Sequence, residues 1–193
     1  MTDIATKHAI AELVPIGSRV LDLGCGDGTM LAHLQQTRSC TGYGVEIDDA
    51  NVLACVQRGV NVIQLNLDEG LAMFDDASFD VVLQLDTLQH LRNAEVMLRE
   101  TVRVGRVGIV AFPNFAHWPN RLSVLRGRMP VTRRLPYQWY DTPNIRVGTH
   151  ADLAALALGS GLKVLDSFGL QDGCTVRWLP NLRAGTSVYC LSR

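Results

Sequence analysis

The sequence predicts an α/β fold in which helices cover both faces of a mostly parallel sheet. Short apolar runs alternate with helical patterns, and a glycine-rich turn joins the first run to the first helix. The last two runs follow one another without room for an ordinary crossover helix. A chain of 193 residues suits one domain with a substantial core, so we expect residues 1–193 to form a single domain.

The expected elements follow in order along the chain. Apolar runs at 19–23, 42–47, 60–65, 79–85 and 106–112 predict five parallel strands, and runs at 162–168 and 186–191 predict two more. Helical patterns at 29–36, 50–58, 94–104 and 150–158 lie between them. Because residues 169–185 leave little room for a crossover, we expect one antiparallel strand at the edge of the sheet.

Capping residues mark the helix starts. Asp48 or Asp49 can cap helix 50–58, and Asn93 precedes helix 94–104. Thr149 and Asp152 have the spacing of a capping box at the start of helix 150–158.

Residues 113–148 interrupt the alternation of strands and helices. This segment follows the fifth expected strand and is rich in proline, arginine and aromatic residues. We interpret it as an insertion on the side of the sheet where ligands bind in such folds.

Composition excludes several classes of protein. Hydrophobic residues make up 47% and charged residues 19% of the chain, which excludes a disordered or fibrous protein. No apolar run is long enough to span a membrane and the first ten residues lack a leader pattern, so we expect a cytoplasmic protein. The five cysteines include no C-x-x-C pair, which predicts buried or half-buried thiols, and no metal-ligand spacing is present.

The two halves of the chain carry opposite charge. Residues 1–100 contain 6 basic and 15 acidic side chains, whereas residues 101–193 contain 12 basic and 4 acidic ones. Two interpretations remain open: the second half meets an acidic ligand or partner, or the two halves neutralise each other in the fold.

The glycine-rich turn predicts a ligand site. Asp22 lies near the end of the first expected strand, and Gly24, Gly26 and Gly28 lie between that strand and helix 29–36. There the backbone can approach a ligand closely, and the helix start offers unpaired N–H groups. Glu46 ends the second expected strand. Its carboxylate can accept both hydroxyls of a ribose, through hydrogen bonds that contribute roughly 1.5–3 kcal/mol.

The charge of the turn discriminates between two nucleoside cofactors. A dinucleotide site normally has G-x-G-x-x-G, but Thr29 stands at the third glycine position, and the Asp22 carboxylate would repel a pyrophosphate. S-adenosylmethionine carries an ammonium and a sulfonium and no phosphate. The turn therefore favours S-adenosylmethionine or its demethylated product, S-adenosylhomocysteine.

The string VLDLGCGDG at 20–28, with Glu46, resembles the first two motifs of class I S-adenosylmethionine-dependent methyltransferases. The resemblance implies a Rossmann-like fold with a seven-stranded, mostly parallel sheet and one antiparallel strand. It also implies that the glycines line the methionine part of the cofactor and that Glu46 holds the ribose.

The position that matches the family's adenine-binding acid is Asn66. Its amide oxygen can accept the adenine amino group without charge assistance, at a cost on the order of 1 kcal/mol, while Asp68 could cap a helix that begins at Glu69. The cofactor site implied by the resemblance comprises Asp22, Gly24, Cys25, Gly26, Gly28, Glu46, Ile47, Asn66, Leu67 and Gln84.

More specific strings lie mainly in the second half. FPNFAHW at 112–118, RGRMPVT at 126–132 and LPYQWYDTPNI at 135–145, with DEGL at 68–71 and TLQ at 87–89, resemble the methionine-biosynthesis MetW family. The resemblance covers about residues 17–191 and implies a role beside homoserine O-acyltransferase, with no established methyl acceptor. Asn66, Asp86 and His90 depart from the family pattern.

Methyl transfer needs a positioned acceptor and often a base. Asp86, His90 and His117 follow the fourth and fifth expected strands and are candidates. Alternatively, Asp86 caps the next helix, His90 bonds to backbone and His117 packs beside Trp118. The sequence identifies none of them as the base, so the catalytic residues stay unassigned.

The insertion combines aromatic side chains with five arginines between positions 121 and 134, and residues 121–134 contain no acid. Such residues dominate protein interfaces, which favours docking onto a partner enzyme over a lid on the cofactor pocket. Nucleic acid is disfavoured, since the pI is about 6.5 and no recognition motif is present. The expected partner-binding residues are Trp118, Arg121, Arg126, Arg128, Arg133, Arg134, Trp139 and Tyr140.

The sequence thus predicts an accessory partner of homoserine O-acyltransferase that binds S-adenosylmethionine or S-adenosylhomocysteine without a metal. One alternative is a methyltransferase whose small-molecule acceptor lies under the insertion. A third class, an RNA-associated methyltransferase, predicts steeply salt-dependent binding to nucleic acid.

Overall fold

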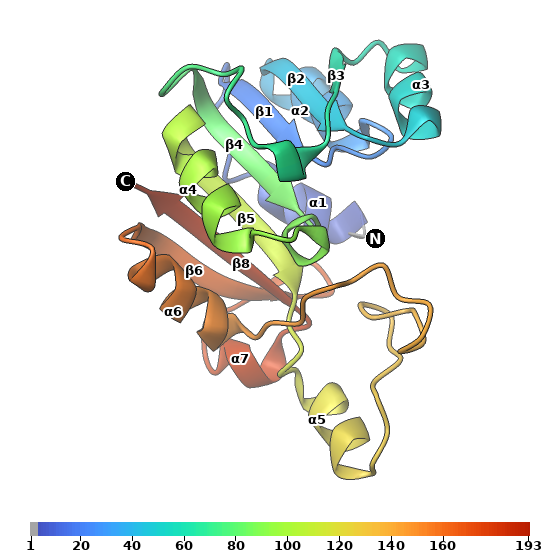
Figure 1. Cartoon of the computed structure of the whole chain (residues 1–193). Helices are drawn as coiled ribbons and strands as arrows, with labels where there is room; N and C mark the ends of the chain where they lie inside the picture. The colour runs from blue at the N-terminus through green and yellow to red at the C-terminus, as the bar shows by residue number, and fades with distance from the viewer. Residues whose placement is uncertain (1–3) are drawn as a thin grey trace.

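A computed structural model describes residues 4–193. The expectation that residues 1–10 form no leader falls partly on residues 1–3, which lie outside the described part. The described chain folds around an eight-stranded sheet with strand order β3-β2-β1-β4-β5-β8-β6-β7 (Figure 1). Its strands are β1 (Arg19–Leu23), β2 (Thr41–Glu46), β3 (Val62–Gln64), β4 (Phe79–Leu85), β5 (Gly105–Pro113), β6 (Lys163–Gln171), β7 (Cys174–Val176) and β8 (Thr186–Ser192).

The first five strands are parallel, as the apolar runs predicted. β8 is antiparallel to β5 and β6, but it lies between them, so its expected place at the sheet edge is wrong. The edge is β7, an eighth strand that the seven-stranded expectation lacked. β7 pairs with β6 across Asp172 and Gly173, whose φ angles of 50° and 80° suit the Asp-Gly turn of a tight hairpin.

The helices are α1 (Ile4–Ala11), α2 (Thr29–Arg38), α3 (Asp49–Gln57), α4 (Ala94–Val104), α5 (Trp118–Leu125), α6 (His150–Gly159) and the short α7 (Pro180–Arg183), with 3-10 turns η1 (Leu67–Glu69) and η2 (Leu88–His90). Asp48 caps α3 by accepting from the Asn51 N–H, and Thr149 forms the predicted capping box with Asp152. Asn93 occupies the N-cap of α4, although its side chain makes no capping bond.

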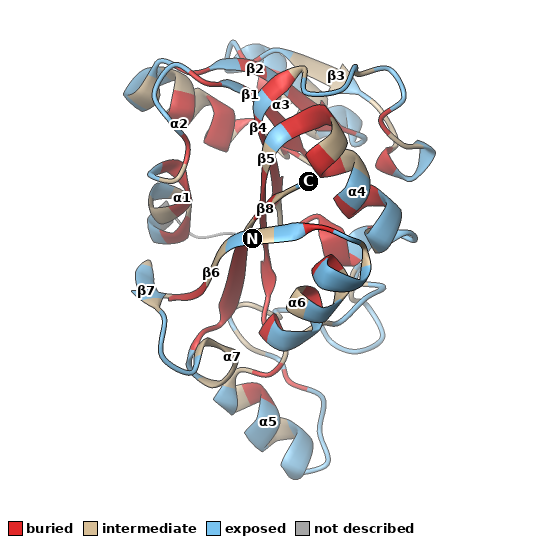
Figure 2. Ribbon diagram, turned by 90° about the vertical axis from the view of Figure 1, so that its left-hand side faces the viewer, coloured by how far each residue is buried: buried red, intermediate tan, exposed pale blue. Residues whose placement is uncertain are grey.

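Apolar side chains on the two faces of the sheet form the core. α1 and α2 cover one face, and α4 and α6 cover the other (Figure 2). Leu34 and Leu83 are fully buried on the first face, and Leu98 and Val110 on the second. Burying each such side chain stabilises the fold by about 1.5–3 kcal/mol. The stable sheet fixes the positions from which the loops at its carboxyl ends start.

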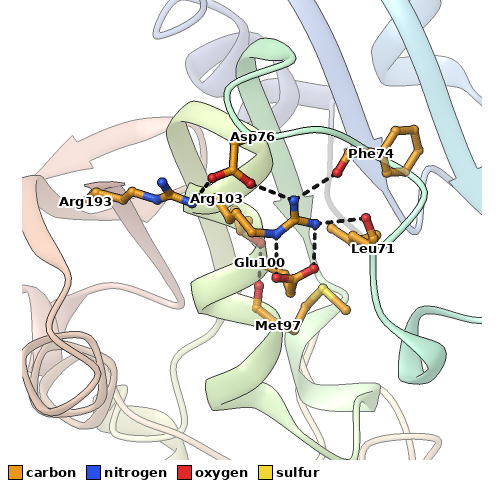
Figure 3. A network of polar contacts seen from close by, with 8 residues as sticks. Leu71, Phe74, Asp76, Met97, Glu100, Arg103 and Arg193 are labelled. Carbon is orange, nitrogen blue, oxygen red and sulfur yellow. Dashed lines mark hydrogen bonds and ion pairs between the residues drawn. The ribbon is translucent and has the colours of Figure 1, made fainter.

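Arg103 of α4 neutralises part of the acidic first half. Its guanidinium donates to the Glu100 carboxylate at 2.7 and 2.8 Å, to Asp76 at 2.9 Å, and to two carbonyl groups of the 70–77 loop (Figure 3). Arg193 pairs with the same Asp76 at 3.0 Å. These contacts hold the loop before β4 on α4 and agree with the interpretation that the two halves neutralise each other.

The cysteines are free thiols. Cys25, Cys40 and Cys55 are buried and Cys190 is half-buried, as predicted, but Cys174 is exposed because it begins the edge strand β7. Within residues 4–193, no helix is long and apolar enough to cross a membrane.

Candidate functional site

The glycine loop between β1 and α2 is held in one conformation by its neighbours. Gly24, Gly26 and Gly28 have φ angles of 71°, 56° and 74°, in the left-handed region that favours glycine. The N–H groups of Gly24 and Cys25 both donate to the Val45 carbonyl, at 2.8 and 3.0 Å. A side chain at Gly24 would also lie 2.6 Å from the Thr87 hydroxyl, so glycine is required there for packing as well.

Asp22 is a carboxyl group buried at the wall of a cavity. It is 2% exposed, and it lines a space of about 440 Å³ together with Gly24, Gly26 and Lys7 of α1. Burial raises the pKa of Asp22 to about 7; Lys7 acts to lower it and Glu46 to raise it further. A cation bound in this cavity would restore the favourable interactions that the buried carboxylate has lost with water.

Glu46 links the end of β2 to the glycine loop. One carboxylate oxygen accepts from the Gly26 N–H at 2.8 Å, and the other accepts from Ile47 at 2.8 Å and Asp48 at 3.1 Å. A carboxylate has about four acceptor positions, so one remains for a ligand hydroxyl. Accepting a second hydroxyl requires the release of one of these backbone contacts.

A second cavity of about 440 Å³ lies on the other side of Gly24. Leu65, Leu67 and Leu91 provide apolar walls, with Ile47 and Glu46 at the β2 end. The first and second cavities share Gly24, Asp86 and His90, so they form one cleft along the carboxyl ends of β1, β2 and β4. This is the position at which open α/β sheets bind ligands.

Asn66 and Asp68 both line the second cavity, but Asn66, and not Asp68, has the capping role. Asn66 is the residue that caps a helix: its side chain accepts from the Asp68 N–H at 3.1 Å at the start of η1. Asp68 lies inside η1 and accepts from the Arg92 N–H at 2.9 Å. The prediction that Asp68 caps a helix at Glu69 is therefore wrong.

Most of the other predicted cofactor residues line the cleft, but Gly28 and Gln84 do not. Gly28 packs against Cys55 and Val60 instead, and a side chain there would lie 2.9 Å from the Cys55 sulfur. Cys25 lines the first cavity, and Ile47 and Leu67 line the second. Gln84 is fully buried within β4, and neither its amide oxygen nor its nitrogen has a hydrogen-bond partner among the described residues. Side chains alternate along a strand, so Gln84 points to the α4 face while Leu85 reaches the cavity.

Two contributors to the site were missed from sequence. Lys7 comes from α1, a helix that the apolar pattern did not indicate. Thr87 packs against Gly24, with its hydroxyl 2.8 Å from the Leu23 carbonyl. The string TLQ contained Thr87, but only the packing of β4 beside β1 reveals its contact.

The candidate bases are each engaged in other contacts. Asp86 does not cap a helix but forms an ion pair with Arg134 at 3.1 Å, with both side chains largely buried. His90 lines both cavities, and its Nδ1 lies 3.0 Å from the Pro143 carbonyl. His117 packs edge-on against Trp118 and lines a separate cavity of about 110 Å³. Both contacts match the non-catalytic alternatives for the two histidines.

Residues 126–147, here called the strap, run from the end of α5 back toward α6 (Figure 1). On one side the strap lines the first cavity through Arg134, Pro136, Tyr137, Pro143 and Asn144. On the other it exposes Trp139 and Tyr140, at 72% and 70%.

α5 and the strap together carry a basic and apolar surface. Arg121 is used internally, since its Nε donates to the Ala116 carbonyl at 2.6 Å, and Arg133 pairs with Asp172 at 3.6 Å. Among residues 4–193, Arg126 and Arg128 form no ion pair. The exposed apolar members of the surface are Trp118, Leu122, Val124, Leu125, Met129, Val131, Tyr137, Trp139, Tyr140, Ile145 and Val147.

Within residues 4–193, no three His, Cys, Asp or Glu side chains are grouped so that they could hold a metal ion.

Solved structures share this fold at low sequence identity. A chain in the complex between the Haloferax volcanii Trm112 methyltransferase activator and a methyltransferase has a TM-score of 0.72 at 18% identity, with 97% of this chain and 88% of that chain covered. An S-adenosylmethionine-dependent methyltransferase from Mesorhizobium loti also has a TM-score of 0.72, at 15% identity and 98% coverage of both chains. The fold is therefore that of class I S-adenosylmethionine-dependent methyltransferases.

The profile of the family described as "Methionine biosynthesis protein MetW" matches residues 5–191, and the chain belongs to this family. The bifunctional methionine biosynthesis protein MetXA/MetW of Rhodopirellula baltica is 38% identical over 202 residues, which cover 97% of this chain. The chain spans 32% of that relative's length. A ubiquinone biosynthesis O-methyltransferase of Pseudomonas fluorescens is 30% identical over 162 residues, covering 80% of this chain and 68% of that protein.

Proposed function

We propose that this methionine biosynthesis protein binds S-adenosylmethionine or S-adenosylhomocysteine and acts as a cytoplasmic accessory partner of homoserine O-acyltransferase. The observation that carries the cofactor assignment is the cleft that places the buried Asp22 carboxyl beside the glycine loop and Glu46 at its far end. The insertion at 113–148 would supply the partner surface on a single methyltransferase-like domain.

The residues of the first cavity fit the methionine part of such a cofactor. Asp22 suits the ammonium group, and Lys7 supplies a positive charge for the carboxylate. The loop residues Gly24, Cys25 and Gly26 line this cavity and would allow close approach of the ligand, because Gly24 and Gly26 have no side chain.

The residues of the second cavity fit the adenosine part. Glu46 has one open acceptor position for a ribose hydroxyl, and Ile47 and Leu67 offer apolar contact to the adenine. Asn66 or Asp68 would accept the adenine amino group. The chemistry that S-adenosylmethionine would supply is a transferable methyl group, and Asp86 lines both cavities of the cleft that would hold it.

The partner assignment rests on family membership and on the exposed surface. In the Rhodopirellula baltica relative, the matching region forms part of a protein named MetXA/MetW, so both activities occur on one chain there. In this chain the basic, aromatic surface of α5 and the strap would replace that covalent link. Arg134 differs from the other predicted docking residues, because it is mostly buried by its pair with Asp86.

A small-molecule methyltransferase is the second candidate. It is favoured by Asp86 and His90, which line the cavity where an acceptor would lie. It is opposed by their contacts, since Asp86 pairs with Arg134 and His90 bonds to the Pro143 carbonyl.

Two measurements test the proposal. Calorimetric titration of S-adenosylhomocysteine into the chain should show binding that Glu46→Gln weakens about tenfold, because the hydrogen bond to the ribose loses its charge assistance. Homoserine acylation by the host acyltransferase should then increase when this chain is added. Binding without any effect on acylation and without co-purification would leave the methyltransferase as the better candidate.

A further inference from the structure

We propose that the strap couples the cofactor cleft to the partner surface, so that cofactor binding strengthens docking of an acidic, partly apolar protein face onto the strap. This inference rests on the proposed function and adds regulation to the same site. The Asp86–Arg134 ion pair would be the connecting element.

The strap is bonded at several points to residues 86–92, the segment after β4. Arg134 pairs with Asp86 at 3.1 Å, and the Pro143 carbonyl lies 3.0 Å from His90 Nδ1. The N–H groups of Ile145 and Arg146 both donate to the Gln89 carbonyl, each at 3.0 Å. The Arg146 guanidinium also donates to the Arg92 carbonyl at 2.6 Å.

Segment 86–92 also forms part of the cofactor cleft. Asp86 and His90 line both cavities, and Thr87 and Leu91 line the second. Thr87 further contacts the glycine loop at Gly24. A ligand in the cleft therefore touches the same segment to which the strap is bonded.

Asp86 and Arg134 connect the two by charge. Their side chains are 16% and 14% exposed, so their attraction is screened much less than that of a surface pair. Asp86 also has a left-handed φ of 53°, a conformation that its surroundings must maintain. A bound ligand that fixes segment 86–92 would thus favour the strap position in which Arg134 reaches Asp86.

The outer side of the strap would contact the partner, so fixing the position of the strap would strengthen partner binding. Trp139 and Tyr140 form an edge-on pair with ring centroids 5.7 Å apart, and both project from the strap into solvent. Large aromatic side chains with neighbouring arginines are typical binding hot spots. The net positive charge of Arg126 and Arg128 selects a partner face that is acidic.

Coupling of this kind is reciprocal: a cofactor that strengthens partner binding must itself be bound more tightly when the partner is present. Couplings between protein sites are commonly about 5- to 150-fold in affinity. For contacts confined to one segment, we expect about tenfold.

Hydrogen exchange on the full chain tests the coupling without the partner. Saturating S-adenosylhomocysteine should slow exchange of the Ile145 and Arg146 amide protons about tenfold, because their bonds to Gln89 open less often. With S-adenosylhomocysteine at a concentration that calorimetry shows to be saturating for each variant, Arg134→Ala and the size-matched Asp86→Asn should abolish this slowing. The matched control is Arg177→Ala, which removes an exposed arginine–aspartate pair with Asp166, at 2.8 Å, outside the cleft.

The acyltransferase then completes a thermodynamic cycle. Its affinity for the wild-type chain should rise about tenfold with S-adenosylhomocysteine present, and this rise should vanish in Asp86→Asn but persist in Arg177→Ala. Suppose that both ligands bind, that neither changes the affinity for the other, and that S-adenosylhomocysteine does not slow amide exchange in the strap. The coupling is then overturned and the proposed function stands. If S-adenosylhomocysteine gives no binding signal with the wild type, the proposed function fails and the coupling falls with it.

Discussion

The glycine loop and the strap face each other across the same cavity, but they are stabilised in different ways. The loop has three left-handed glycines, two N–H groups bonded to the Val45 carbonyl and a carboxyl group beside it that is almost fully buried. The strap has no helix or strand in residues 126–147, and its Trp139 and Tyr140 side chains are largely exposed. Its attachment depends on a few bonds to segment 86–92.

This difference suits the two proposed roles, a rigid site for a small ligand and an adaptable surface for a partner. A loop that is already ordered loses little conformational entropy when a small ligand binds, so its contacts contribute directly to affinity. A strap with few anchors must be ordered on binding, which makes it sensitive to events in the neighbouring cavity. The contrast between a rigid ligand site and an adaptable partner surface can be tested by substitutions on each side.

The largest expected effect is at the root of the insertion, at Asn114. This buried amide donates to the Ala184 carbonyl at 2.8 Å and accepts from the His150 N–H at 3.1 Å, among other contacts. Asn114→Ala leaves several buried backbone groups unpaired and should lower the free energy of unfolding by about 3–5 kcal/mol in urea titrations. Asn61→Ala, which loses one bond of 3.5 Å, is the control and should lower it by less than about 0.5 kcal/mol. A loss below about 1 kcal/mol at Asn114 would show that the root is as adaptable as the strap.

Substitutions at two glycines of the loop distinguish the effect of glycine on packing from its effect on ligand approach. Gly24→Ala adds a clash with Thr87 to the strain of a left-handed alanine, and should destabilise the chain by about 2–3 kcal/mol. Gly26→Ala meets nothing within 4 Å in the chain itself, so it should cost only about 1 kcal/mol of stability. Both should weaken S-adenosylhomocysteine binding. Thermal unfolding measures the stability loss of each variant, and calorimetry measures its ligand affinity. Equal stability losses for the two variants would contradict the packing argument for Gly24.

On the strap, Trp139→Ala should change partner binding without changing the fold. The side chain is 72% exposed, so the free energy of unfolding should move by less than about 0.5 kcal/mol. Loss of a hot-spot tryptophan should weaken acyltransferase binding by at least about 30-fold, or 2 kcal/mol. The matched control is Trp178→Ala, since Trp178 is 70% exposed on another part of the surface. Equal effects of the two substitutions would remove the strap from the interface.

Over a single pH unit, the smallest expected effect is the pH dependence of ligand binding at Asp22. Because burial raises the pKa of this carboxyl to about 7, it is protonated and neutral below that pH and attracts a ligand ammonium less strongly. Affinity for S-adenosylhomocysteine should therefore rise with pH by up to about tenfold per unit below pH 7 and level off above it. Calorimetry across this range should show the slope in the wild type and in Asp166→Asn, but not in Asp22→Asn.

The stability of the ligand-free chain should have the opposite slope. The folded chain retains a proton on Asp22 between the usual value of 3.8 and about 7, whereas the unfolded chain does not. This group therefore contributes a loss of stability as pH rises through that interval, and a constant penalty above it. A Tm contribution that rises with pH, measured as the difference between wild type and Asp22→Asn, would contradict the burial argument.

Local sequence patterns were sufficient for the five parallel strands, for α2, α3, α4 and α6, and for the glycine-rich turn. The five parallel strands, the capping box at Thr149 and the glycine loop all follow from residues within a few positions of each other. Asp22, Gly24 and Glu46 stand at the ends of strands, and parallel strands bring their carboxyl ends to one edge. The second cavity, with Ile47 and Leu67, extends the same edge.

Tertiary structure decided the features that join distant parts of the chain. The place of β8 between β5 and β6, the burial of Gln84 on the α4 face and the Asp86–Arg134 pair depend on which segments pack together. Periodicity and turn residues determine local conformation, but they carry no information about partners 48 residues apart, as in that ion pair. Only the packed sheet brings the strap onto the segment after β4, and so relates the proposed partner surface to the proposed cofactor cleft.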